Sequence, residues 1–214
     1  MGLLNDLEKD LKKEKRKLIR DIQGETKGER WNRRRLKMAQ EAWSRYSGPM
    51  SRNEFMSWYM KKGVARSKKA VKKQASKWDK KALAAGKKLT VEKVMKIMNS
   101  LSLRRTPRSE AHFLAWLEKH MPGGLREYGE FEFGGTTHRP DFYINKDIVF
   151  ELKIVRSNTE LHTAIGQALI YSYKYPYVFL LIYDARHGYD AVELIDDELD
   201  FLWTKQIVVI QYPD

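Results

Sequence analysis

The sequence predicts an α/β domain in residues 106–214, preceded by a basic, all-helical region in residues 1–105. Hydrophobic residues recur at helical spacing through the first part, and helical and strand-like spacing alternate through the second. The charge also changes sign between the parts. Residues 1–105 carry 31 Lys and Arg against 11 Asp and Glu, a net charge of +20, whereas residues 106–214 carry 10 against 17, a net charge of −7. A basic module joined to a domain with a different task explains this asymmetry.

The basic region is predicted to be a series of helices. Its expected elements are an amphipathic helix marked by Leu4, Leu7, Leu11, Leu18 and Ile22, and a second helix over residues 29–46. Ser51-Arg52-Asn53-Glu54 has the form of a capping box, which opens a third helix. Thr90 is the expected N-cap of a helix that contains Val91, Val94, Met95, Ile97 and Met98.

Between the last two helices, residues 66–88 contain ten basic residues and only Asp79 as an acid. So much positive charge favours binding to the phosphate backbone of nucleic acids, although a solvated helix face is the simpler interpretation of the pattern alone. The residues that we expect to contact nucleic acid are Arg66, Lys68, Lys69, Lys72, Lys73, Lys77 and, from the second part, Lys174.

The α/β part is expected to begin with a helix capped by Thr106, with Pro107 as its first residue. The helix buries Phe113, Leu114 and Leu117, and Glu110 falls on the same stripe. A carboxylate on an apolar stripe is costly unless it is paired or binds a metal, whereas an acid in the first helical turn also favours the positive end of the helix dipole. The sequence supports both roles for Glu110.

The remaining elements follow in order. A strand is expected at residues 128–133, after Gly123-Gly124, and a second helix at residues 159–174. The core stripe of that helix is Leu161, Ala164, Ile165, Ala168 and Leu169, and an adjacent stripe is Gln167, Tyr171 and Lys174. The apolar run of residues 177–183 is typical of a buried central strand. A short helix at 196–204 and a strand at 206–212 complete the domain.

A hairpin in residues 139–153 carries the most informative side chains. Alternation along a strand places Glu151 and Lys153 on one face. A two-residue loop at 145–146 would pair Asp141 with Phe150, on the wrong face, whereas a three-residue loop at 145–147 pairs Asp141 with Glu151. The second register also puts Phe142, Ile144, Ile148, Phe150 and Leu152 on one apolar face. The hydrophobic and the chemical patterns therefore predict the same register.

This arrangement has the ligands for a hard divalent cation beside a phosphate. Mg²⁺ takes oxygen ligands and keeps several waters, so that one or two carboxylates suffice to hold it. Asp141 and Glu151 are the candidate ligands, with the carbonyl of Leu152 as a further one. Lys153 is placed to orient an attacking water or to stabilise charge that develops on the phosphorane. The pattern fits one metal ion or two.

The residues Pro140-Asp141 and Glu151-Leu152-Lys153 resemble the motif of the PD-(D/E)xK nuclease superfamily. That family has a restriction-endonuclease-like core of helix, three strands, helix and strand, which is the order expected from residue 106 onward. The family commonly places a further acid on the first helix, where Glu110 stands. RecB-like branches carry a glutamine and a tyrosine four residues apart on the second helix, as Gln167 and Tyr171 are. The resemblance covers the second half of the chain.

The resemblance implies a deoxyribonuclease that depends on Mg²⁺ or Mn²⁺, with Asp141, Glu151, Lys153, Glu110, Gln167 and Tyr171 as catalytic residues and Asp141, Glu151, Leu152 and Glu110 around the metal. An endonuclease of DNA repair, recombination or replication is the expected function. Several alternatives stay open: a DNA-binding protein with a nuclease-like fold and no activity, RNA as the substrate, a homodimer that resolves Holliday junctions, and an exonuclease that acts as a monomer.

Other features exclude some classes of protein. The chain has no cysteine, and therefore neither a disulfide nor a thiolate zinc site. Its five histidines lack the spacing of a metal site. No apolar run is long enough for a membrane span, and the N-terminus lacks the apolar core of a signal peptide. An intracellular, cytoplasmic protein that associates with nucleic acid is the expectation.

Overall fold

The computed structural model describes residues 27–62, 68–103, 106–186 and 193–212. The chain forms two compact units, residues 1–45 and 46–214. Helix α2 (Lys27–Arg45) is the described element of the first unit and matches the helix expected at 29–46. The helix expected around Leu4 to Ile22 lies outside the described residues. The second unit begins at Tyr46, so the boundary between compact units differs from the boundary expected after residue 105.

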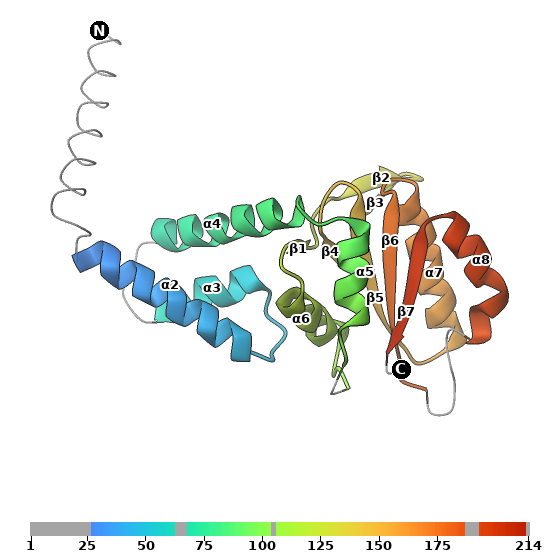
Figure 1. Ribbon diagram of the computed structural model, residues 1–214, viewed down its shortest axis with the longest axis horizontal. Coiled ribbons are helices and arrows are strands. Elements are labelled where there is room, and N and C mark those ends of the chain that lie inside the picture. Colours follow the sequence, from blue (N-terminus) through green and yellow to red (C-terminus); the bar gives the residue numbers. More distant parts are fainter. Residues whose placement is uncertain (1–26, 63–67, 104–105, 187–192, 213–214) are drawn as a thin grey trace, which may run out of the picture. The chain divides into compact units, whose positions relative to one another are not determined.

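The second unit is built around a mixed five-stranded sheet (Figure 1). Its strands, in spatial order, are β1 (Leu125–Arg126), β4 (Phe142–Tyr143), β5 (Ile148–Val155), β6 (Tyr177–Asp184) and β7 (Ile207–Tyr212). Strands β5, β6 and β7 run parallel, and β1 and β4 are antiparallel to their neighbours. The α/β class is therefore confirmed. From α6 (Glu110–His120) to β6, the sheet strands and helices follow in the order helix, three strands, helix, strand.

Helices cover both faces of this sheet. On one face, α5 (Val91–Asn99) and α6 pack their apolar side chains against Phe142, Phe150 and Leu152. On the other face, α7 (Asn158–Ser172) and α8 (Asp196–Thr204), which follows the short 3-10 helix η1 (Glu193–Ile195), pack against Val149 and Val178. Because side chains alternate along a strand, β5 and β6 contribute to both layers of the core. Their continuous burial follows from this position in the middle of the sheet.

Two further helices, α3 (Arg52–Lys62) and α4 (Lys68–Gly86), belong to the same unit. The predicted capping box opens α3: the Ser51 amide donates to Glu54 Oε2 at 2.7 Å and the Glu54 amide to Ser51 Oγ at 3.2 Å. Thr90 is the N-cap of α5, as expected. The basic run of residues 66–88 is largely the helix α4.

A buried ion-pair triad attaches the start of α3 to α6 and β1. Glu118, only 2% exposed, accepts hydrogen bonds from the Arg52 amide at 3.0 Å and from Arg126 Nε at 3.1 Å. The Arg126 guanidinium also donates to the carbonyl oxygens of Pro49 and Met50 at 2.9 and 3.1 Å. Burial raises the pKa of Glu118, and the charges of Arg52 and Arg126 oppose that shift. Such a triad fixes how α3, α6 and β1 are arranged, because a charge left unpaired in the interior would be costly.

Helix α4 lies so close to the sheet that the two backbones are in direct contact. The Gly124 amide donates to the carbonyl oxygen of Ala82 at 3.2 Å. A Cβ atom at Gly86 would overlap the carbonyl oxygen of Ile144, and one at Gly123 would overlap the backbone of Gly86. Glycine is therefore required where the end of α4 meets the β4–β5 turn, because any side chain would force the two segments apart.

Asn145 joins that contact to the turn itself. Its Nδ2 donates to the carbonyl oxygens of Gly86 and Leu89, both at 3.1 Å. Its Oδ1 accepts from the amides of Asp147 and Ile148 at 2.9 and 3.1 Å. The side chain is 7% exposed. One residue thus closes the turn between β4 and β5 and holds the end of α4 against it.

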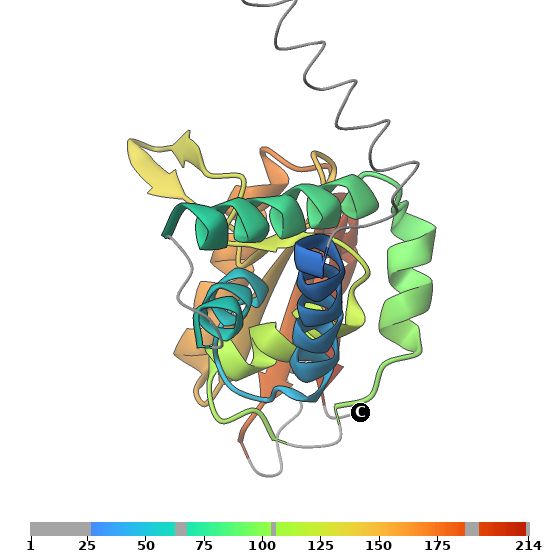
Figure 2. The same ribbon diagram turned by 90° about the vertical axis from the view of Figure 1, so that its left-hand side faces the viewer.

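Three expected elements differ from the structure. The strand expected at 128–133 is replaced by β1 and by a separate hairpin of β2 (Phe131–Phe133) and β3 (Thr136–His138), which stands away from the sheet in Figure 2. Positive φ angles at Glu127 and Gly129, 46° and 83°, turn the chain out of the sheet between them. The N-cap of α6 is Ser109 instead of the expected Thr106. The Thr106 hydroxyl accepts a hydrogen bond of 2.9 Å from the Tyr183 hydroxyl. Helix α7 ends at Ser172, before Lys174.

We predict that Asn145→Ala lowers the free energy of unfolding by about 2–4 kcal/mol, because it leaves two carbonyl oxygens and two amides of a buried turn without their partner. Urea unfolding followed by tryptophan fluorescence measures the change. Lys146→Ala, an exposed residue of the same turn, is the matched control and should change stability little. Equal stabilities of the two variants would contradict the role assigned to Asn145.

Candidate functional site

The β4–β5 hairpin brings two carboxylates together. Phe142 pairs with Phe150 and Tyr143 with Val149, so Asp141, which immediately precedes β4, comes opposite Glu151. Residues 145–147 form the turn, and the Ile144 amide donates to the carbonyl oxygen of Ile148 at 3.1 Å. The register and the three-residue turn predicted from the sequence are both confirmed. The apolar face predicted with them is part of the core on the α6 side of the sheet.

The two carboxyl groups lie in a largely buried setting. Glu151 is 3% exposed and Asp141 is partly buried. Asp141 Oδ2 accepts a hydrogen bond of 2.8 Å from the Leu152 amide. Glu151 Oε2 makes no hydrogen bond with the described residues. This oxygen is buried, polar and available to a ligand.

Burial of the pair raises both pKa values. The pKa of Asp141 rises to about 6, chiefly through burial, while the Leu152 amide lowers it and the charge of Glu110 raises it. The pKa of Glu151 rises to about 9 through burial and through the charge of Asp141. Burial therefore favours the neutral form of both carboxyl groups, and that of Glu151 more strongly. Two adjacent carboxylates in a site of low polarity are expected to behave in this way.

Lys153 lies on the same face of β5 as Glu151 and pairs with Glu110. Lys153 Nζ lies 3.2 Å from Glu110 Oε1. Glu110 is the first residue of α6, directly after the N-cap Ser109, and is about half exposed. It therefore stands in the first turn of the helix, as one of the two alternatives expected, and its exposure shows that it does not lie on the buried stripe of α6. Its direct partner, however, is the lysine.

Tyr171 and Gln167 extend from α7 toward the same face. Tyr171 is 3% exposed, and its hydroxyl donates to the carbonyl oxygen of Arg139 at 2.9 Å. Burial raises its pKa, and the nearby charges of Glu151 and Asp141 raise it further. Gln167 Oε1 is buried without a hydrogen-bond partner among the described residues. Tyr171 thus belongs to the core under the site, and its contact with Arg139 orders the segment that leads into Asp141.

Leu152 was expected to offer its carbonyl oxygen to a metal ion, and the contact that the structure shows is the hydrogen bond from its amide to Asp141. Within the described ranges, no group of three or more His, Cys, Asp or Glu residues lies close enough to hold a metal ion. The site therefore consists of the Asp141–Glu151 pair, the Glu110–Lys153 pair beside it, and backbone groups of β5.

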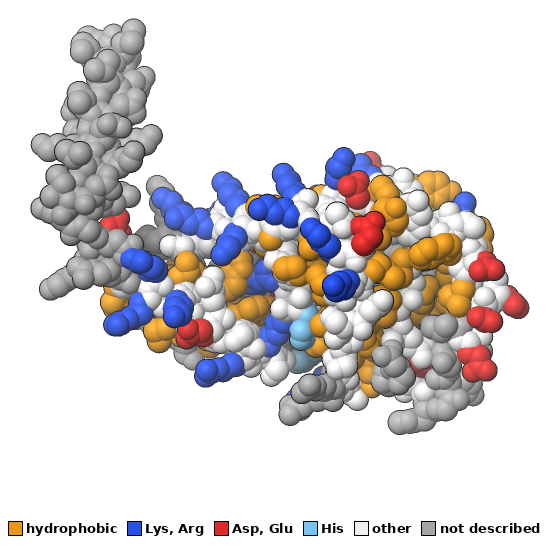
Figure 3. Space-filling view, in the orientation of Figure 1, with side chains coloured by type: hydrophobic (Ala, Val, Ile, Leu, Met, Phe, Trp, Pro, Cys, Tyr) orange, Lys and Arg blue, Asp and Glu red, His pale blue; other side chains and the backbone are white. Residues whose placement is uncertain are grey.

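The predicted nucleic-acid contacts lie apart from this pair. Lys72, Lys73 and Lys77 are exposed on α4, and Lys174 is exposed just beyond the end of α7. Figure 3 shows Lys and Arg side chains along α4 and acidic side chains over α8 at the other end of the unit. The backbones of Lys68 and Lys69 belong to α4, whereas Arg66 lies outside the described residues.

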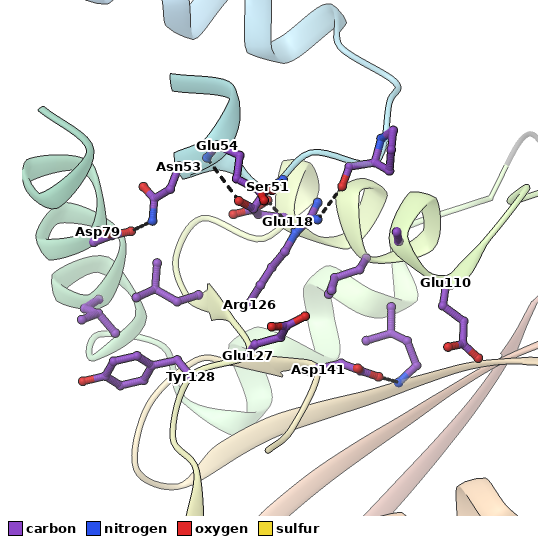
Figure 4. A pocket seen from close by; sticks show the side chains of 16 residues that line it. Ser51, Asn53, Glu54, Asp79, Glu110, Glu118, Arg126, Glu127, Tyr128 and Asp141 are labelled. Carbon is purple, nitrogen blue, oxygen red and sulfur yellow. Dashed lines mark hydrogen bonds and ion pairs between the residues drawn. The ribbon is translucent and has the colours of Figure 1, made fainter. Parts of the chain in front are cut away.

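A cavity of about 720 Å³ opens beside Asp141, whereas Glu151 is not part of its wall. Figure 4 shows Glu110 and Asp141 at one end of it, and Asn53 and Asp79, from α3 and α4, at the other. Leu83, Ala111, Leu114, Leu125 and Tyr128 are among the residues of its wall. The site is thus reached from the space between the α3–α4 pair and the α6–β1 segment.

Compared with protein-family models, curated proteins and solved structures, the chain matches none of them. In the part of the chain that the structure describes, no helix combines the length and the apolar character needed to span a membrane.

Three features of the site were not predicted. Asn145 was expected only as part of the three-residue loop at 145–147, and the Arg52–Glu118–Arg126 triad and the cavity wall at Tyr128 carry no periodic signal. The buried position of Glu118 gave one sequence clue, because it follows Leu114 and Leu117 on the apolar side of α6. Its partners, 66 and 8 residues away, are beyond the reach of local pattern analysis.

We predict that Glu151→Gln stabilises the protein at pH 8 in the presence of EDTA, by about 2–4 kcal/mol. The pKa of Glu151 is raised from 4.5 to about 9 on folding. Between these values the folded state holds a proton that the unfolded chain releases, so the stability of the wild type falls as the pH rises. The amide carries no such penalty.

Thermal unfolding between pH 5 and pH 8 measures this effect, and the advantage of Glu151→Gln should shrink toward pH 5. Glu132→Gln, an exposed glutamate of β2, is the matched control and should follow the wild type at every pH. A Glu151→Gln variant with the same pH dependence as the wild type would contradict the buried, protonated state.

Proposed function

We propose that this protein is a metal-dependent deoxyribonuclease of the PD-(D/E)xK type. The observation that carries the proposal is the position of Asp141 opposite Glu151, with Lys153 two residues further along β5. The order of α6, three sheet strands, α7 and β6 supports it, as do Glu110, Gln167 and Tyr171 at the positions that this family uses.

The acid pair has the character of a cation site. Both side chains offer the oxygen ligands that Mg²⁺ or Mn²⁺ prefers. The buried Glu151 Oε2, which has no hydrogen-bond partner among the described residues, supports a cation between the two groups, as does the burial that raises both pKa values. Asp141 and Glu151 would hold the ion, with Leu152 contributing its carbonyl. The ion, when bound, lowers the pKa of a water and screens the charge of the phosphate.

The chain's own groups perform the remaining tasks. Lys153 is a cation at the edge of the pair and would orient the water or stabilise charge that develops on the phosphate. Glu110 keeps the ammonium group in place through its ion pair. Tyr171, through the carbonyl oxygen of Arg139, holds the segment that leads into Asp141, and Gln167, four residues before it on α7, has a buried side-chain oxygen.

Charge supports DNA as the substrate. The domain with the acids has a net charge of −7, whereas residues 1–105 have a net charge of +20. An acidic domain is repelled by a phosphate backbone unless a basic module brings it there. The exposed lysines of α4 supply such a surface in the same compact unit as the acid pair.

We predict that the purified protein cuts DNA with Mg²⁺ or Mn²⁺, and that Asp141→Asn, Glu151→Gln and Lys153→Ala lower the rate by about 100-fold or more. The assay uses labelled duplex, single-stranded and four-way-junction DNA. Asp196→Asn, an exposed acid of α8, is the matched control and should cut at the wild-type rate.

A second readout does not depend on activity. Mn²⁺ should raise the thermal midpoint of the wild type and of Asp196→Asn, but not of Asp141→Asn, because ligands that bind only the folded state stabilise it. If DNA is bound in a salt-sensitive manner, no substrate is cut and Mn²⁺ has no effect, the protein is a DNA-binding protein with a nuclease-like fold and without catalysis.

A further inference from the structure

We propose that the cavity between the α3–α4 pair and the α6–β1 segment receives a single strand of DNA and leads it to Asp141, so that the substrate is single-stranded DNA or the single-stranded part of a larger structure. The inference rests on the proposed nuclease function, because it names the strand that the Asp141–Glu151 pair would act on. It concerns a different set of residues, on α3, α4, α6 and the segment after β1.

The shape of the cavity is the first argument. It is continuous from Asn53 and Asp79 to Glu110 and Asp141 (Figure 4). Its volume of about 720 Å³ is in the range of pockets for small ligands, about 300–1,000 Å³. One or two nucleotides fit such a space, whereas a base-paired duplex does not. A phosphate that enters from this side therefore belongs to an unpaired strand.

The charges of the wall are the second argument. Three of the six acids that line the cavity form ion pairs: Glu118 with Arg52 and Arg126, Glu110 with Lys153, and Glu127 with Arg139 at 3.8 Å. Asp79 accepts a hydrogen bond from Asn53. The cavity is therefore less repulsive to a nucleic acid than its acid content suggests. Carboxylate and amide oxygens along the wall are acceptors for the amino groups of bases.

An exposed aromatic ring in the wall is the third argument. Tyr128 is 47% exposed and lines the cavity, and its ring contacts that of Tyr143 at a tilt of 60°, with the ring centroids 5.0 Å apart. Proteins that bind single strands use such rings as stacking platforms, because an unpaired base offers a free π-face. Leu83, Leu114 and Leu125 add apolar surface around it.

Helix α4 supplies a path from the cavity to the basic surface. Asp79 and Leu83 lie one turn apart on its cavity side. Lys72, seven residues before Asp79, falls on the same stripe, about 10 Å farther along the helix axis. Its side chain is exposed. A strand with its bases in the cavity would therefore meet a cation for its backbone at the outer end of the stripe.

The test fills the cavity and measures binding without cleavage. Ala111 is exposed and lines the cavity, so Ala111→Trp places an indole in the path of the strand. We expect it to weaken binding of a fluorescein-labelled oligo-dT about tenfold, measured by fluorescence anisotropy in EDTA. Ala84→Trp, at an exposed alanine of α4 outside the cavity wall, is the matched control and should bind as the wild type does.

Tyr128→Ala gives an independent measurement that does not depend on how Ala111→Trp folds. It should weaken oligo-dT binding about fivefold or more through the loss of one stacking contact, and circular dichroism verifies its fold. Tyr173→Ala removes an exposed tyrosine outside the cavity wall and should have less effect. Oligo-dT binding that is unchanged in both Ala111→Trp and Tyr128→Ala overturns the inference.

A cleavage assay distinguishes the failure of this inference from the failure of the proposed function. With Mn²⁺, the wild type should cut oligo-dT and the single-stranded tail of a tailed duplex, and leave a blunt duplex intact. If the blunt duplex is cut as fast as oligo-dT and Asp141→Asn is inactive, the nuclease proposal stands and the cavity inference fails. If both cavity variants lose oligo-dT binding and no DNA is cut, the cavity inference stands and the nuclease proposal fails.

Discussion

The hydrogen bonds of Asn145 are the constraint on which the rest of the site depends. Through Oδ1 they set the turn that places Asp141 opposite Glu151, and through Nδ2 they attach the end of α4 to that same turn. A shift of the hairpin by one residue would move every side chain of β4 to the opposite face and separate the two acids. The geometry of the acid pair and the position of the basic helix therefore depend on one buried amide.

Within the fold, the Asp141–Glu151 pair is energetically unfavourable. The surrounding core would be more stable with apolar or neutral residues at these positions, since both carboxyl groups resist ionisation there. Strain of this kind in an otherwise apolar sheet is characteristic of functional sites, where stability is given up for chemistry. The partners that the structure supplies, the Leu152 amide and Lys153, compensate only part of the cost, and a cation would compensate the rest.

The Arg52–Glu118–Arg126 triad joins the two halves of the second unit. It attaches α3 to α6 and β1, while the glycines around residue 124 let α4 approach the sheet. Together these contacts leave a cavity beside Asp141 where closer packing of the helices would have covered the acids. Helices α3 and α4 therefore form one wall of the space in front of the site.

The sequence by itself determined the α/β class, the β4–β5 register and the residues of the acid pair, because these depend on alternation along strands and on a turn of three residues, which are local properties. It also located α8 and the caps at Ser51 and Thr90. The tertiary structure alone decided that β1 and the β2–β3 hairpin replace one strand, that Glu110 pairs with Lys153, and that α3 and α4 share a unit with the sheet. Those outcomes depend on contacts between residues far apart in the chain, such as Arg52 with Glu118, for which local patterns contain no signal.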